Sequence, residues 1–197
     1  IFNHINANLY AYAANNPVRY IDPDGRKIII GITTSDDPWG RIVGQHAFIM
    51  YIDEKDPKKS IMLDASGQYG GARSSDVIDG YQTKITVEDY LKYFDTDETL
   101  TTFELTLSPK EEKKIKDAIG MIEGYNWLQC ANEASQVLNE NYSKEIKKTN
   151  KPAVLLKSLI AFFKAHPEKE VTIRQYDFKT NKEIKNDGDN KSENESN

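Results

Sequence analysis

The sequence predicts an α+β domain over residues 28–178, with a small antiparallel sheet packed with several helices. Strand-like runs are either rich in β-branched residues or alternate apolar with polar residues; they lie at 27–33, 45–53, 59–66, 99–107 and 170–178. Helix-like runs carry recognisable start signals and lie at 86–94, 109–123, 130–141 and 152–164. Strands and helices that do not alternate regularly are typical of the α+β class.

The first strands follow one another closely. The run at 27–33 is dominated by isoleucine, and the run at 45–53 alternates and is largely apolar. A short turn of charged residues with one proline separates 45–53 from the strand at 59–66. We therefore expect these two strands to be antiparallel neighbours. The Gly-, Ser- and Asp-rich segment 67–80 is predicted to be a loop.

The later elements are defined by their ends. Thr86 is the expected N-cap of the first helix. Ser108, Pro109 and Glu111 form a capping-box start, and the helix is expected to run to about residue 123. The helix that starts at Pro152 is followed by the closing strand. Residues 179–197 are polar and free of aromatic residues, so we expect a disordered tail.

The composition excludes several functional classes. The 197 residues carry a formal charge of −5, which argues against a nucleic-acid-binding surface. No apolar run approaches the roughly 20 residues of a membrane span. With one cysteine there is neither an internal disulfide nor a cysteine-rich zinc site, and the three histidines are scattered, so no metal or cofactor is expected. Because residue 1 is Ile, we expect the chain to be a piece of a larger product.

Three residues suggest a nucleophilic site. Cys130 stands at the predicted start of a helix, where partial positive charge stabilises a thiolate. His46 lies in the strand at 45–53, and Asp64 lies near the end of the neighbouring strand. A cysteine, a histidine base and a group that orients the imidazole form the activated-nucleophile arrangement. Gln45, Gln129 and Asn132 are further candidates for holding the ring or binding an oxyanion.

Residues 1–27 differ from the rest in their Tyr, Asn and Pro content. Residues that match a long, spaced pattern are Leu9, Tyr10, Tyr12, Asn15, Asn16, Pro17, Asp22, Pro23 and Gly25. This segment resembles the end of the core of Rhs and YD-repeat proteins. The resemblance implies a β-shell in the parent chain, a toxin domain after the motif, and self-cleavage with Asp22 and Asp24 as candidates. Both aspartates equally fit ordinary turns.

The chain order of the three site residues resembles that of circularly permuted papain-like hydrolases, relatives of the NlpC-type peptidases. The shared features are a histidine strand first, a polar residue on the next strand, and a helix starting Cys130-Ala131-Asn132 last. The two resemblances together imply a secreted antibacterial effector, delivered into a target cell by type VI or related secretion. They also imply a peptide, protein or lipid acyl substrate and a cognate immunity protein.

Other interpretations stay open at this point. A lone cysteine is often a small buried apolar residue, and His46 and Asp64 each fit a structural role. The domain would then be a non-catalytic delivery or binding module. A toxin of another chemistry, such as a nuclease or an ADP-ribosyl transferase, is a third possibility. His166, near a predicted helix end, is expected to cap helix carbonyls.

Overall fold

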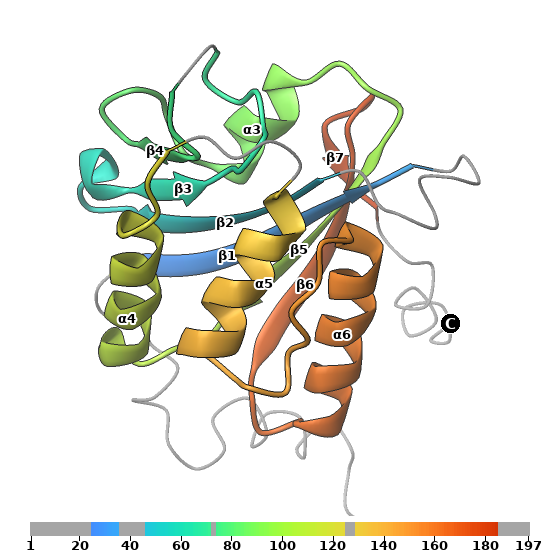
Figure 1. Cartoon of the computed structure of the whole chain (residues 1–197). Helices are drawn as coiled ribbons and strands as arrows, with labels where there is room; N and C mark the ends of the chain where they lie inside the picture. Colours follow the sequence, from blue (N-terminus) through green and yellow to red (C-terminus); the bar gives the residue numbers. More distant parts are fainter. Residues whose placement is uncertain (1–24, 36–45, 72–73, 125–128, 185–197) are drawn as a thin grey trace, which may run out of the picture.

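An antiparallel sheet forms the centre of the structure (Figure 1). The computed structural model describes residues 25–35, 46–71, 74–124 and 129–184. Within these residues the sheet has seven strands in the order β4-β3-β2-β1-β5-β6-β7. The strands are β1 (Arg26–Thr34), β2 (His46–Asp53), β3 (Ile61–Leu63), β4 (Val77–Asp79), β5 (Thr99–Leu105), β6 (Val171–Asp177) and β7 (Lys182–Glu183).

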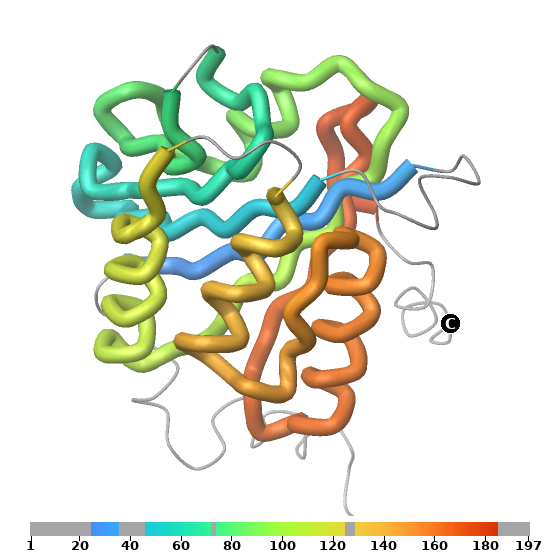
Figure 2. The backbone as a smooth tube through the Cα atoms, in the orientation of Figure 1, coloured from blue at the N-terminus to red at the C-terminus, as the bar shows by residue number. Residues whose placement is uncertain are grey.

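Helices cover both faces of this sheet, and the described residues hold four of them. They are α3 (Val87–Tyr93), α4 (Pro109–Gly120), α5 (Cys130–Asn141) and α6 (Pro152–Ala165), and a 3-10 turn, η2 (Pro57–Lys59), joins β2 to β3. The helices α4, α5 and α6 pack side by side on one face, as the tube in Figure 2 shows. Residues of α3 pack on the opposite face. The predicted α+β class is therefore confirmed.

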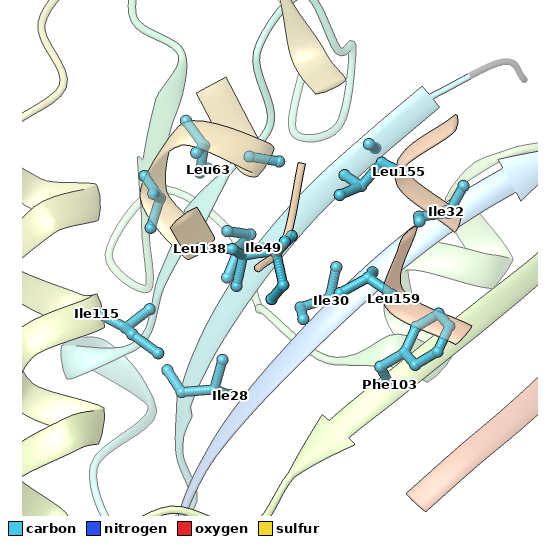
Figure 3. Packing of buried hydrophobic residues seen from close by; sticks show 14 of the residues in the cluster. Ile28, Ile30, Ile32, Ile49, Leu63, Phe103, Ile115, Leu138, Leu155 and Leu159 are labelled. Carbon is cyan, nitrogen blue, oxygen red and sulfur yellow. The ribbon is translucent and has the colours of Figure 1, made fainter. Parts of the chain in front are cut away.

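The alternation of β1 explains how two apolar layers form on one sheet. Ile28, Ile30 and Ile32 point to the face covered by α4, α5 and α6, where Figure 3 shows them among residues of those helices. Ile29 packs in the second cluster, with Phe48 and residues of α3. Burying each such side chain contributes about 1.5–3 kcal/mol to stability. β1 carries apolar side chains on both of its faces, which suits its central place in the sheet between β2 and β5.

The predicted helix starts are found as expected. The Thr86 hydroxyl accepts a hydrogen bond from the Asp89 N–H at 3.0 Å. Ser108 and Glu111 form the reciprocal capping box. The strand at 45–53 and the strand at 59–66 are antiparallel neighbours, with Ile49 opposite Leu63.

Two strands lie where the sequence indicated none. The predicted loop 67–80 contains β4, because Met62 pairs with Ile78 and Ile78 is buried. This strand is so short, and so closely flanked by Gly, Ser and Asp, that its composition conceals it.

The prediction of disorder from residue 179 is wrong for 179–184, which contain a turn and β7. Asp177 Oδ1 accepts the Thr180 N–H at 2.7 Å, and Asn181 adopts a left-handed φ of 54°. These local contacts form the turn between β6 and β7 despite the polar composition. Residues 185–197 lie outside the described residues.

The expected boundary between residues 27 and 28 falls inside β1. Arg26 and Lys27 already pair with Asp53 and Ile52 of β2. The Glu54 N–H also donates to the Gly25 carbonyl at 2.8 Å. The sheet therefore begins before the point at which the sequence predicted the domain to start.

Candidate active site

His46 and Asp64 form a direct hydrogen-bonded pair at one end of the sheet. His46 Nε2 lies 2.6 Å from Asp64 Oδ1. The strand register accounts for this contact. Leu63 lies opposite Ile49, so Asp64 and Phe48 point to the other face of the sheet, and His46 shares that face with Phe48. The His46 side chain is 16% exposed to solvent, whereas the Asp64 side chain is completely buried.

Cys130 is the first residue of α5, and its thiol lies at the start of β2. Burial raises the pKa of the Cys130 thiol, while hydrogen bonding with the His46 side chain and with the backbone N–H groups of Ala47 and Ala131 lowers it. Because Asp64 engages Nε2 of the imidazole, we assign the contact with sulfur to Nδ1. Cys130 is 9% exposed, so a small part of it remains accessible from outside.

The electrostatic environment favours an ion pair between the thiol and the imidazole. Burial alone lowers the pKa of His46, but its hydrogen bonds to Asp64 and Cys130, with their negative charges, raise that pKa to about 10. Burial alone raises the pKa of Cys130, but the hydrogen bond and positive charge of His46, with the two backbone donors, bring that pKa below its ordinary value. A thiolate next to an imidazolium is the reactive form of a cysteine nucleophile.

The structure places differently the three residues that the sequence offers for holding the imidazole or binding an oxyanion, Gln45, Gln129 and Asn132. Asp64, and not Gln129 or Asn132, holds the imidazole. The Asn132 Nδ2 group instead donates to Gln129 Oε1 at 2.8 Å, which fixes the Gln129 amide next to Cys130. The Gln129 backbone N–H donates to Ser66 Oγ at 3.2 Å, so this N–H is already used. Gln45 lies outside the described residues.

The turn after β3 contains residues that sequence reasoning missed. The Ser66 N–H donates to Oδ1 of the fully buried Asp76, and the Asp64 N–H donates to the Asp76 carbonyl. A Cβ atom on Gly67 would lie 2.0 Å from Asp64 Oδ2. The sequence signal for this turn is the Asp-Ala-Ser-Gly string, of which only Asp64 is predicted to belong to the site.

The remaining predicted residues lie elsewhere. Asp22 and Asp24 fall outside the described residues. The prediction that His166 caps helix carbonyls is wrong, because its ring nitrogens face Glu145 Oε2 at 2.9 Å and Glu168 Oε1 at 3.2 Å. Nearby carboxylates outcompete neutral carbonyls for an exposed imidazole that gains positive charge.

The described residues offer neither a metal-binding cluster nor a membrane-spanning helix. Within the described residues, no group of three or more His, Cys, Asp or Glu side chains is arranged to hold a metal ion. No helix in the same part of the chain is long and apolar enough to cross a membrane.

Comparison with known proteins identified no relative of this chain. No family model matches the chain, and neither a curated protein nor a solved structure matches it.

Proposed function

We propose that the chain is the C-terminal, toxin-bearing end of an Rhs protein, and that its folded domain is a cysteine hydrolase of permuted papain-like fold. One observation carries the catalytic part of this proposal: Asp64 is hydrogen-bonded to the His46 ring, and Cys130 lies close enough to raise the pKa of the same ring. The chain order of histidine strand, aspartate strand and cysteine helix further supports the permuted arrangement. The Rhs assignment rests on the motif in residues 1–27.

The proposed reaction is acyl transfer through a thioester. The Cys130 thiolate attacks a carbonyl carbon of an amide or ester, and the carbonyl electron pair moves onto oxygen. The backbone N–H of Cys130, at the start of α5, is the donor that we assign to this oxyanion, with the Gln129 amide beside it. On collapse, the leaving nitrogen or oxygen takes a proton from the His46 imidazolium.

The second half of the reaction restores the ion pair. A water molecule attacks the thioester while neutral His46 takes one of its protons, and the thiolate departs as the acid forms. Asp64 keeps the ring in place in both halves and stabilises its charged form. An amine or hydroxyl in place of water would give transfer instead of hydrolysis. Peptidase, amidase, deamidase and transferase activities all use these same steps.

The biological setting follows from the Rhs resemblance. The toxin would be delivered into a competing bacterium, and the parent β-shell would enclose it before release. A cognate immunity protein would protect the producing cell. The net charge of −5 suits an immunity protein with a basic binding face.

Alkylation of the thiol tests the catalytic part of the proposal, because Cys130 is the single cysteine and iodoacetamide therefore reports on it alone. We expect fast alkylation at pH 7 and a rate profile whose midpoint lies below that of an ordinary thiol, about 8.5. His46→Ala is expected to move the midpoint to the ordinary range or above it. His166→Ala, which removes a histidine whose ring nitrogens face Glu145 and Glu168, is the matched control and should leave the profile unchanged.

Expression in bacteria tests the toxic role. We expect growth arrest from the wild-type chain in the cytoplasm or the periplasm, and relief by Cys130→Ala. The compartment that shows arrest identifies where the substrate lies. Toxicity that survives Cys130→Ala in both compartments would instead support a non-catalytic module or a toxin of another chemistry.

A further inference from the structure

The helix that carries Cys130 is tied at its start to the turn that carries Asp64. The Ser66 hydroxyl accepts a hydrogen bond from the Gln129 backbone N–H at 3.2 Å, across 63 positions of sequence. Gln129 is the N-cap residue of α5, and its own side chain makes no capping hydrogen bond. A residue of another element therefore binds the backbone at this helix start.

Ser66 reaches α5 from an uncommon backbone conformation. Its φ of 59° lies in the left-handed region, which costs a non-glycine residue about 1–2 kcal/mol. A conformation of this kind persists only when its surroundings hold it, and such positions cluster at functional sites. The hydrogen bonds of Asp76 provide that support here.

Asp76 connects the turn that carries Asp64 and Ser66 with the residue Gly124, which precedes α5 in the chain. Its side chain accepts the Ser66 N–H at 3.1 Å, and its carbonyl accepts the Asp64 N–H at 2.8 Å. Its own N–H donates to the Gly124 carbonyl at 2.7 Å, in the segment that leads to α5. Asp76 is fully buried, so these bonds are shielded from water.

We propose that Ser66, held by Asp76, is a positioning residue that sets the start of α5, and with it Cys130, against the His46–Asp64 pair. One short turn then presents both the carboxylate that holds the imidazole and the hydroxyl that holds the nucleophile's helix. Proton sharing between sulfur and imidazole needs hydrogen-bond contact, so a displacement of about 1 Å at the helix start is enough to weaken it. The inference rests on the proposed cysteine chemistry.

The test separates the Ser66 hydroxyl from its backbone conformation. Ser66→Gly removes the acceptor but suits a positive φ better than serine does, so the turn should remain folded. We expect its alkylation rate at pH 7 to fall roughly two- to tenfold, the size of a helix-terminus effect, with the midpoint moved to higher pH. Ser66→Asn tolerates the left-handed region and offers a side-chain oxygen, so it should recover part of the loss.

Ser135→Ala is the matched control on the same helix. The buried Ser135 hydroxyl accepts the Thr149 N–H at 2.9 Å and donates to the Asn132 carbonyl at 3.1 Å. Its loss should lower the melting temperature and leave the alkylation profile in place. A merely structural Ser66 would behave in the same way as this control.

Two comparisons decide the outcome. A wild-type profile in Ser66→Gly overturns the positioning role, whatever the melting temperature does. The His46→Ala variant, measured alongside, judges the cysteine chemistry separately. If His46→Ala shifts the profile and Ser66→Gly does not, only the positioning role fails; if neither shifts it, both proposals fail.

Discussion

His46 Nε2 and Asp64 Oδ1 lie 2.6 Å apart, although 18 positions separate the two residues in the sequence. The short connection between β2 and β3 makes the strands antiparallel neighbours, and the shared face brings the two side chains together. Asp64 is completely buried, so the positive charge of a protonated His46 beside it offsets the loss of solvation. The Cys130 thiol therefore interacts with an imidazole whose charged form is already stabilised by Asp64.

Asp64→Asn tests this relationship while keeping the size of the side chain. An amide oxygen still accepts a hydrogen bond, but it no longer supplies a negative charge, so the pKa of His46 should fall. We expect the alkylation rate of Cys130 at pH 7 to fall by about tenfold or more. Asp56→Asn, at a half-buried aspartate paired with Lys59, is the control. Equal rates in Asp64→Asn and the wild type would remove Asp64 from the proposed triad.

Gly67→Ala should disturb the same carboxylate by crowding it. The added Cβ would lie 2.0 Å from Asp64 Oδ2, so the carboxylate has to leave its place beside His46. We expect a loss of thiol reactivity like that of Asp64→Asn, with a further cost of about 1–3 kcal/mol in unfolding free energy. Gly120→Ala meets nothing within 4 Å and is the matched control. A reactive, stable Gly67→Ala protein would show that the carboxylate has room to move without consequence.

Gly31→Ala tests the packing of the second apolar cluster. A Cβ atom there would lie 2.0 Å from the ring of Phe48, the cross-strand partner of Gly31. Phe48 cannot retreat freely, because its ring centroid lies 4.4 Å from that of Tyr90. We expect a loss of about 1–3 kcal/mol in the free energy of unfolding, measured in urea. Gly120→Ala, in a helix, should gain about 0.5–1 kcal/mol under the same conditions.

Local patterns predicted most of the fold. Alternation and β-branched runs marked the longer strands, and Thr86, Ser108 and Pro152 marked three helix starts. The short strands β4 and β7 were not predictable, because they have only three and two residues and pairing with a neighbouring strand, not composition, creates them.

The candidate site was predictable only where sequence neighbours define it. A short turn between strands predicted that His46 and Asp64 meet, and a helix start indicated a place for Cys130. The hydrogen bond from Gln129 to Ser66 was not predictable, because it spans 63 positions and depends on a left-handed φ that serine seldom adopts. The roles of the three residues in catalysis stay a prediction.

The raised pKa of His46 links the charge of the imidazole to folding stability. Comparing Cys130→Ala with the Cys130→Ala/His46→Ala double variant isolates the His46–Asp64 pair, because the titrating thiol is absent from both proteins. His46 in the unfolded chain has a pKa near 6.5; burial lowers the folded value, but the hydrogen bond and charge of Asp64 raise it. The stabilisation is therefore complete below about pH 6.5 and is lost as the pH rises through the folded pKa, which is about 10 in the wild-type chain and lower in Cys130→Ala, because Cys130 also raises it.

We expect the difference in unfolding free energy between these two variants to decline by up to about 1.4 kcal/mol per pH unit above pH 6.5. Urea unfolding between pH 6 and pH 10 measures this slope. A histidine with an ordinary pKa would give a flat difference over the same range, because both states would lose the proton together. A flat result would mean that Asp64 does not hold a charged imidazole, and the backbone donors of Ala47 and Ala131 would then have to lower the pKa of Cys130.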